Sequence, residues 1–337
     1  MTVPLHLKGY DIQCNGQKYV PSSENFRKHS SSRATSNSVW SSSSVIYSRS
    51  SKPSFSNANF PTTPEGRTYH LGTKGGEVAN RILSVGATQR AELLSKLLDP
   101  PPNGGQLFRY LSSRGFLTVT GEYQGTPISI VSTQMGMPNM DFVVRECRAV
   151  VEGPMAVVRL GTCGALQPPA SLGQLIIAHS SINIRRNPDA WSDLSTASML
   201  PAYMFTLPVQ ADPHIVRLLA EEASSTMGAS NVISGLNATA DSFYSSQGRV
   251  GGNFDDRNEG LIEEMCEKYP DMVSLEMETF HLLDMARCSG GRVRAAGMCL
   301  ALADRKSNEM LEYARLEQLE VEAGLAALRA LIKTDLD

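Results

Sequence analysis

The stretch that decides the fold is VVRLGTCGALQP, residues 157–168. Together with the two residues before it, its first half (MAVVRLGT, residues 155–162) has the length and composition of a buried β-strand, and glycine and polar residues follow. Arg159 interrupts this apolar run. A charge on a buried strand requires an anionic partner, either an acid on a neighbouring helix or a bound ligand. This stretch alone leaves both possibilities open.

Two other stretches end an apolar strand in the same way, SVGATQR (84–90) and LALADR (300–305). Ligands of open α/β sheets bind at the carboxyl ends of strands, so we expect these stretches to form corners of one pocket. Gly86 would let the backbone approach an anion, Arg90 adds charge and Thr162 adds a hydroxyl. Guanidinium groups and a hydroxyl suit phosphate. The sequence has neither a GxxxxGK[ST] loop nor a GxGxxG fingerprint, which excludes a P-loop and a Rossmann site.

Outward from these stretches, apolar strands alternate with amphipathic helices. This order predicts an α/β protein: a single-domain α/β/α sandwich with a central mixed β-sheet. Asp212 is expected to cap a helix that has Pro213 in its first turn. The predicted strands are 81–87, 155–162, 174–183, 230–240 and 294–304, with a hairpin at 117–133; the predicted helices are 89–99, 140–152, 212–225, 261–270, 278–288 and 316–333.

The chain before this domain has a different composition. Residues 21–66 are rich in serine, with a single acid before Glu65. Such a segment buries too little apolar surface to order itself, so we expect residues 1–66 to be a disordered N-terminal extension and residues 67–337 to be the folded domain. A transit peptide has a similar composition, but it would begin at the N-terminus rather than after about twenty residues.

Composition excludes several classes of protein. A formal net charge of −3 gives no electrostatic case for binding nucleic acid or an anionic membrane surface. No apolar run reaches the roughly 18 residues of a membrane helix, and the N-terminus lacks a secretory signal. The six cysteines are scattered without metal-ligand spacing, which argues against a zinc site and a disulfide framework. We therefore expect a cytoplasmic protein with reduced thiols and no bound metal.

Two more stretches could carry chemistry. In DSFYSSQGR (241–249), an aromatic residue precedes an amide and a guanidinium, which fits either a surface loop or the wall of a pocket. In SLEMETF (274–280), Glu276 and Glu278 lie where an apolar strand gives way to a helix. Paired carboxylates suit acid–base catalysis or binding of a diol, but acids at a helix start are also favoured by the helix dipole.

Taken together, these motifs resemble the nucleoside phosphorylase superfamily, and within it the uridine phosphorylases. The resemblance runs from YHLG (69–72) to about Glu309. RLGTCGALQP and LEMET are specific to the superfamily, and FYxxQGR separates uridine phosphorylases from purine-type relatives. The QGR and ADR endings are more similar to animal members than to bacterial ones. The matching pieces are SVGATQRA, STQMGMPNMDFVVREC, VVRLGTCGALQP, DSFYSSQGR, SLEMET and LADR.

The resemblance implies reversible phosphorolysis of uridine to uracil and ribose 1-phosphate, with inorganic phosphate as co-substrate and no cofactor or metal. It implies a homodimer or higher homo-oligomer with sites at the subunit interface, where His70 and Arg114 are lent by a neighbouring subunit. The implied phosphate-binding residues are Gly86, Arg90, Arg114, Arg159 and Thr162. The implied nucleoside-binding residues are His70, Cys163, Gly164, Phe243, Gln247, Arg249, Glu276, Met277 and Glu278. The implied catalytic residues are Arg249, Gln247, Glu278 and Arg305.

The sequence also departs from the family pattern. The usual GDPxR phosphate loop reads GATQR, with Ala87 and Thr88 in place of the acid and the proline. Cys163 stands where Thr or Ser is common, and Leu275 where bacterial members often have an aromatic residue. Asp304 occupies the position of the catalytic Asp of purine-type members. Three alternatives therefore stay open: a purine or methylthioadenosine phosphorylase, a nucleosidase that uses water, and a non-catalytic nucleoside-binding protein.

Overall fold

The computed structural model describes residues 54–193, 195 and 197–336. Most of the predicted N-terminal extension, residues 1–53, lies outside the described residues, and its disorder stays a prediction. The described residues form one compact unit. Within this unit Ser56 bridges to Thr62, and Thr62 bridges to Thr68. The compact unit therefore begins before residue 67, where we placed the boundary.

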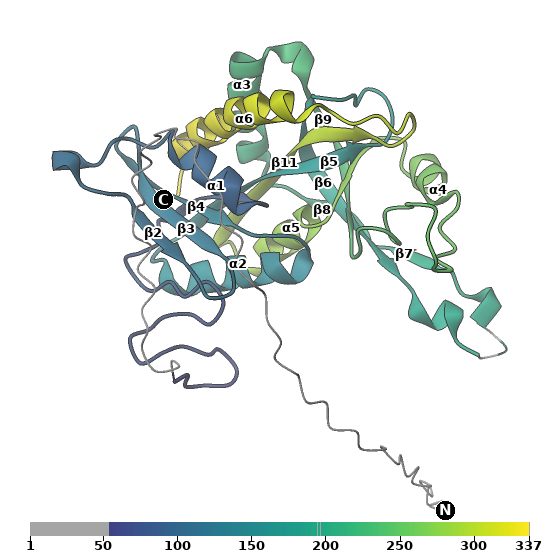
Figure 1. The fold of residues 1–337 in the computed structure, drawn as a ribbon, viewed down its shortest axis with the longest axis horizontal. Helices are drawn as coiled ribbons and strands as arrows, with labels where there is room; N and C mark the ends of the chain where they lie inside the picture. Colours follow the sequence, from purple (N-terminus) through teal and green to yellow (C-terminus); the bar gives the residue numbers. More distant parts are fainter. Residues whose placement is uncertain (1–53, 194, 196, 337) are drawn as a thin grey trace, which may run out of the picture. The chain divides into compact units, whose positions relative to one another are not determined.

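The described strands form one mixed sheet, as predicted (Figure 1). Its main order is β10-β9-β6-β11-β5-β1-β4-β3-β2, with β7 and β8 added to β6. The strands are β1 (Arg81–Val85), β2 (Phe108–Leu111), β3 (Leu117–Tyr123), β4 (Thr126–Ser132), β5 (Met155–Ala165), β6 (Leu175–Arg186), β7 (Tyr203–Phe205), β8 (Val209–Gln210), β9 (Val232–Ala240), β10 (Met272–Glu276) and β11 (Val293–Asp304).

Strand β5 organises the sheet because it pairs with three others. It lies parallel to β1 and to β11, with Leu160 opposite Val85 and Thr162 opposite Leu300. Near its end it also pairs antiparallel with β10, where Gly164 lies opposite Leu275. This last pairing brings the end of β10 to the carboxyl end of β5. The ends of β1, β5, β10 and β11 thus converge at one place, which is where the sequence places its polar motifs.

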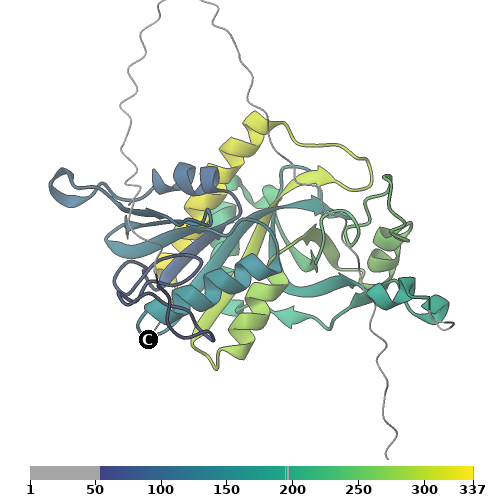
Figure 2. The same ribbon diagram turned by 60° about the horizontal axis from the view of Figure 1, so that its bottom comes forward.

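Helices cover both faces of this sheet, with α1, α3 and α6 on one face and α2 and α5 on the other (Figures 1 and 2). Asp212 caps α3 by accepting the backbone N–H groups of His214 and Ile215, each at 3.0 Å, as predicted. No helix among the described residues is long and apolar enough to cross a membrane. The α-helices are α1 (Thr88–Ser95), α2 (Met137–Val150), α3 (Pro213–Met227), α4 (Leu261–Lys268), α5 (Thr279–Cys288) and α6 (Tyr313–Lys333).

Two glycines set how closely helices approach their neighbours. A Cβ at Gly324 on α6 would overlap the end of the Leu94 side chain on α1, so a larger residue there would force Leu94 to move. A Cβ at Gly297 on β11 would lie 2.5 Å from a side-chain carbon of Thr279, which seats the start of α5 against the sheet. The contact at Gly297 holds the end of α5 that follows Glu278, and the contact at Gly324 holds the helix whose first turn carries Arg90.

Helix α1 differs from its predicted range, 89–99, because it ends at Ser95. The next amides, from Lys96 to Leu98, bond three residues back rather than four, and the N–H of Asp99 donates to the carbonyl of Glu122 on β3. Pro100 follows, and the residue before a proline is disfavoured in the helical region. Apolar periodicity alone could not show that the last turn would be replaced by tighter turns.

Candidate functional site

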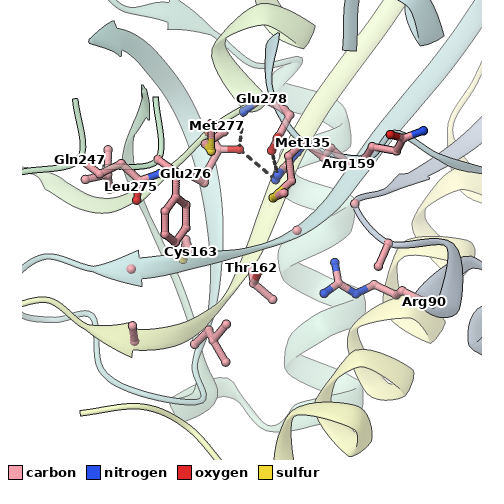
Figure 3. A pocket seen from close by; sticks show the side chains of 18 of the residues that line it. Arg90, Met135, Arg159, Thr162, Cys163, Gln247, Leu275, Glu276, Met277 and Glu278 are labelled. Atoms are coloured by element: carbon pink, nitrogen blue, oxygen red, sulfur yellow. Dashed lines mark hydrogen bonds and ion pairs between the residues drawn. The ribbon is translucent and has the colours of Figure 1, made fainter. Parts of the chain in front are cut away.

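A pocket of about 490 Å³ lies where the ends of β1, β5, β10 and β11 converge (Figure 3). It draws together residues that lie between Gly86 and Met310 in the sequence. Of the predicted site residues, it is lined by Gly86, Arg90, Arg159, Thr162, Cys163, Gly164, Phe243, Gln247, Arg249, Glu276, Met277 and Glu278. His70, Arg114 and Arg305 are not among its lining residues.

One end of the pocket carries the predicted phosphate residues. Arg90, in the first turns of α1, directs its guanidinium towards Thr162, which lies at the end of β5 (Figure 3). Its Nη1 donates to the carbonyl of Leu160 at 3.4 Å, and a Cβ at Gly86 would lie 3.8 Å from this nitrogen. The GATQR loop therefore keeps its arginine at the strand ends without the acid and proline of the usual pattern. This corner offers a guanidinium, a hydroxyl and an open glycine backbone to an anion.

Arg159 finds its anionic partners inside the protein. Its side chain is only 5% exposed; Nη1 lies 3.0 Å from Oε2 of Glu276, and Nη2 contacts Oε2 of Glu278. The guanidinium folds back over Gly161, where a Cβ would lie 2.1 Å from Nη1. Glycine two residues after the arginine is thus required by this geometry. Burial lowers the pKa of Arg159, but the two carboxylates outweigh burial and raise it above its usual value.

Glu276 and Glu278 have different surroundings. Glu276 accepts bonds from Asn237 Nδ2 at 2.9 Å and from the backbone N–H groups of Glu278 and Thr279, so it closes the start of α5. Burial raises the pKa of Glu276, but Arg159 and these donors outweigh it and hold the pKa below its usual value. Glu276 therefore closes the start of α5 from a buried position, with Arg159 as its ion-pair partner, and not as a solvated helix-start acid.

Glu278 has fewer donors and keeps a face towards the pocket. Its Oε1 accepts the backbone N–H of Gly136, and its Oε2 contacts Arg159. Burial raises the pKa of Glu278; Arg159 lowers it, nearby Glu276 raises it again, and the net direction is upward. Of the two carboxylates, Glu278 is the one free to accept hydroxyl groups from a ligand.

DSFYSSQGR forms the opposite wall of the pocket. The Arg249 guanidinium lies 4.0 Å from the centre of the Phe243 ring, donates from Nε to the Phe243 carbonyl at 3.0 Å, and reaches Gln247 Oε1 at 3.4 Å. Buried Asn258 holds this segment from behind through the carbonyls of Ser245 and Arg249, at 3.0 and 3.1 Å. The ring, the amide and the guanidinium form one preorganised unit beside the pocket.

Arg305 lies behind this wall rather than in the lining. Its Nη2 reaches the carbonyl of Gly248 at 3.4 Å, and its stem packs on Gly164, where a Cβ would lie 2.7 Å away. Burial, and then the charge of Arg249, lower the pKa of Arg305 to about 10. Asp304 turns to its own loop, where Oδ1 accepts the N–H groups of Lys306 and Ser307, each at 2.9 Å.

The side chains of His70 and Arg114 do not line the pocket. Buried Glu146, on α2, accepts the backbone N–H of His70 at 3.0 Å and contacts the ring Nδ1 at 2.6 Å. The His70 ring stacks on Phe142 with 3.6 Å between ring centres. The Arg114 guanidinium lies over the Tyr69 ring, 4.3 Å from its centre. Neither side chain lines the pocket of its own chain, and the prediction that they serve a neighbouring subunit stays a prediction.

Cys163, one of the departures from the family pattern, lines the pocket with a protonated thiol. Its Sγ lies 3.6 Å from the carbonyl of Leu300. A hydrogen bond with Cys299, together with burial, raises the pKa of Cys163. Cysteine here is a small apolar wall residue rather than a nucleophile. Among the residues the structure describes, no group of three or more His, Cys, Asp or Glu could hold a metal ion.

Sequence reasoning missed several lining residues and supports. Gln134 and Met135 line the pocket from the loop before α2, and Leu302, Ala303 and Met310 line it from β11 and the following loop. STQMGMPN carried a signal in its sequence, a glycine followed closely by a proline, which is typical of a helix start. In the structure Gly136 has a φ of 96° and precedes α2, and its N–H donates to Glu278. Glu146 and Glu320, which hold His70 and Arg90, lie on helix faces and carried no local signal.

Comparison with known proteins places this architecture among described families. A model described as the phosphorylase superfamily matches residues 80–333. A uridine phosphorylase of Thermococcus kodakarensis is 31% identical over 279 residues, covering 82% of this chain and 90% of that protein. The uridine phosphorylase of Escherichia coli is 26% identical, covering 76% and 93%. A solved structure from a study of two uridine phosphorylases of the oomycete Phytophthora capsici has 41% identity and a TM-score of 0.79, covering 84% of this chain and 100% of that one.

Proposed function

Because the chain belongs to the phosphorylase superfamily, we propose that it is a uridine phosphorylase, which converts uridine and phosphate reversibly to uracil and ribose 1-phosphate. The observation that carries the proposal is the wall formed by Phe243, Gln247 and Arg249, which faces a pocket whose other end holds Arg90 and Thr162. A ring, an amide and a guanidinium match a pyrimidine face and its carbonyl edge.

The reaction separates charge between the sugar and the base. As the bond from C1′ to N1 breaks, its electron pair moves to uracil and positive charge develops on the ribose. Gln247 and Arg249 donate to the carbonyl edge of the base and stabilise the developing anion; one such donor contributes about 3–4 kcal/mol in enzymes where this has been measured. Arg305, fully charged at neutral pH with a pKa of about 10, adds positive charge behind Arg249. The departing base takes up a proton from solvent.

Phosphate is the nucleophile in this proposal. Gly86, Arg90, Arg159 and Thr162 would hold its oxygens so that one of them attacks C1′ as the base leaves on the other face. Glu278 would accept the 2′- and 3′-hydroxyls, and Met277 would pack on the sugar. Positioning of both reactants can supply about 7–11 kcal/mol of a barrier in favourable cases. The reaction requires no covalent intermediate and no cofactor.

We also propose a homodimer or a higher homo-oligomer in the cytoplasm, with His70 and Arg114 serving a neighbouring subunit. Glu146 contacts one ring nitrogen of His70 and Phe142 stacks on one face of the ring, although the ring does not line the pocket described above. A ring held so firmly outside its own pocket supports a role at a neighbouring subunit's pocket, as the resemblance implies.

A purine-type phosphorylase or nucleosidase has less support. Its expected catalytic acid, Asp304, is bound to the amides of its own loop and does not line the pocket. The test is uracil release from uridine, measured by chromatography with and without inorganic phosphate, and repeated with inosine. We expect phosphate-dependent cleavage of uridine and little cleavage of inosine. Release without phosphate would indicate a nucleosidase, and binding of uridine with no release would indicate a non-catalytic protein.

A further inference from the structure

The arginine at the phosphate end of the pocket is fixed by an acid from the C-terminal helix. A single carboxylate oxygen, Oε1 of Glu320, lies 2.7 Å from Nε and 2.6 Å from Nη2 of Arg90. The side chains are 10% and 12% exposed, so the ion pair is largely shielded from water. Glu320 does not line the pocket. Its ion pair with Arg90 connects it to the pocket.

The packing of α1 on α6 explains why these two residues meet. Arg90 and Leu94 lie one turn apart on α1, and Glu320 and Gly324 lie one turn apart on α6. Residues four apart share a helix face. The close approach of Leu94 to Gly324 therefore sets Arg90 directly against Glu320. The contact joins residues 230 positions apart in the chain.

The ion pair uses one edge of the guanidinium, and within the described residues the other edge has no carboxylate partner. Glu320 occupies Nε and Nη2, while Nη1 reaches the carbonyl of Leu160 at 3.4 Å and lies beside Gly86. An arginine side chain that is not held loses considerable rotamer freedom when it binds a ligand, and fixing it beforehand removes that cost. The GATQR loop has no acid of its own that could do this.

We propose that Glu320 is a positioning residue for phosphate binding, which orients Arg90 so that its free edge faces the anion. The inference rests on the proposed function, in which Arg90 binds phosphate. Glu320 acts through Arg90 and does not touch the substrates. Its loss should therefore weaken binding of phosphate and leave binding of uridine nearly unchanged.

The first test is steady-state kinetics of the full-length protein. We expect Glu320→Ala to raise the KM for phosphate about tenfold or more, with kcat at saturating phosphate and the KM for uridine within about twofold of wild type. Glu320→Gln keeps the volume and one acceptor for Nε, so it should raise the KM for phosphate less. Glu317→Gln is the matched control, because Glu317 is an exposed acid on the same helix. An unchanged or lower KM for phosphate in Glu320→Ala would overturn the proposal.

A double-mutant cycle separates positioning from general structural support. If Glu320 acts through Arg90, Glu320→Ala should change the KM for phosphate by less than about twofold in an Arg90→Ala background. An equal rise in both backgrounds would show that Glu320 acts elsewhere, and would overturn the proposal. If Glu320→Ala does not fold, the same cycle is measured with Glu320→Gln.

A binding measurement keeps this inference distinct from the proposed reaction. We expect inorganic phosphate to raise the melting temperature of wild type and of Glu317→Gln, and to raise that of Glu320→Ala much less. If wild type is stabilised by phosphate but releases no uracil, the proposed function fails and the positioning role stands. If phosphate stabilises Glu320→Ala as much as wild type, the positioning role fails whatever the reaction is.

Discussion

Arg159 and Glu278 form an ion pair inside the pocket, with Nη2 of one in contact with Oε2 of the other. The proposed function gives these two residues different ligands, phosphate for Arg159 and the ribose hydroxyls for Glu278. Each side chain is 5% exposed, so neither can exchange its partner for bulk water at low cost. Binding of one ligand must therefore change the contacts available to the other.

We expect an anion at Arg159 to strengthen binding of uridine. An anion draws the guanidinium from Glu278 and frees that carboxylate for the 2′- and 3′-hydroxyls. Linkage requires uridine to strengthen binding of the anion by the same factor. Coupling of this kind typically changes an affinity about five-fold or more. Titration calorimetry of uridine binding with and without sulfate, which cannot form ribose 1-phosphate, measures it directly.

The control for this coupling is Glu278→Gln. An amide removes the ion pair with Arg159 while keeping the size of the side chain, so the effect of sulfate on uridine affinity should largely disappear. A wild-type affinity for uridine that does not depend on sulfate would contradict the coupling. An equal effect of sulfate in Glu278→Gln would show that it arises elsewhere.

The parts of the site that could be predicted are those that lie at the ends of strands. Apolar runs that stop at glycine and polar residues mark a strand end, and the ends of parallel strands meet, so Arg90, Thr162 and Arg305 could be brought to one region from sequence alone. The sequence also indicated that Arg159 has an anionic partner, because its strand is otherwise apolar. Which anion it would contact was not determined by any local pattern.

The supports of the site could not be predicted because they depend on packing between distant elements. Glu320 meets Arg90 through a helix contact set by Gly324, and Glu146 meets His70 across 76 residues. In the sequence, both acids look like ordinary solvated positions on amphipathic helices. The antiparallel pairing of β10 with the end of β5 likewise joins strands that are far apart in the sequence.

Asp212 should stabilise the fold in two separable ways. It caps α3 and also binds Arg294, with Oδ2 2.7 Å from Nε. Asparagine can still cap a helix, so Asp212→Asn should lose only the partly exposed ion pair, up to about 1 kcal/mol. Asp212→Ala should lose about 1 kcal/mol more, because the cap is also removed. Urea unfolding at pH 7 measures both free energies.

The pH dependence of this effect has a definite sign. Burial raises the pKa of Asp212, but Arg294 and the two capping amides outweigh it and lower the pKa below its usual value. A depressed pKa in the folded state gives stability above the unfolded pKa of about 3.9, and this stability is lost as the pH falls through the folded pKa. The difference in free energy of unfolding between wild type and Asp212→Asn should therefore become smaller as the pH falls from 7 to about 3. A difference that grows on acidification would contradict this assignment.

Arg249 should be needed for pyrimidine nucleosides in particular. Removing a preorganised donor to a developing anion typically costs about 10²–10³ in kcat, so we expect a loss of this size for uridine in Arg249→Ala. Any residual cleavage of inosine should fall much less. The matched control is Arg217→Ala, an exposed arginine on α3 that pairs with Glu221. A uridine rate that survives Arg249→Ala would show that the base binds elsewhere.

His70 offers the sharpest test of the subunit arrangement. Its ring is held by Glu146 through Nδ1 and stacked on Phe142, yet it lies outside the pocket lining of its own chain. If it serves a neighbouring subunit, His70→Ala and Arg249→Ala damage sites from opposite sides of the interface. A mixed pair of these subunits would then contain one site with both changes and one site with neither.

We therefore expect two weakly active variants to restore activity to each other. Unfolding and refolding an equal mixture of His70→Ala and Arg249→Ala should return roughly a quarter of wild-type activity, because half of randomly formed dimers are mixed and each mixed dimer has one intact site. The uracil release of the refolded mixture is compared with that of each variant refolded alone. Refolding of Arg249→Ala with Gln247→Ala is the control, since both changes lie on the same wall and no intact site can form. If the refolded mixture of His70→Ala and Arg249→Ala is no more active than each variant refolded alone, His70 does not act across an interface.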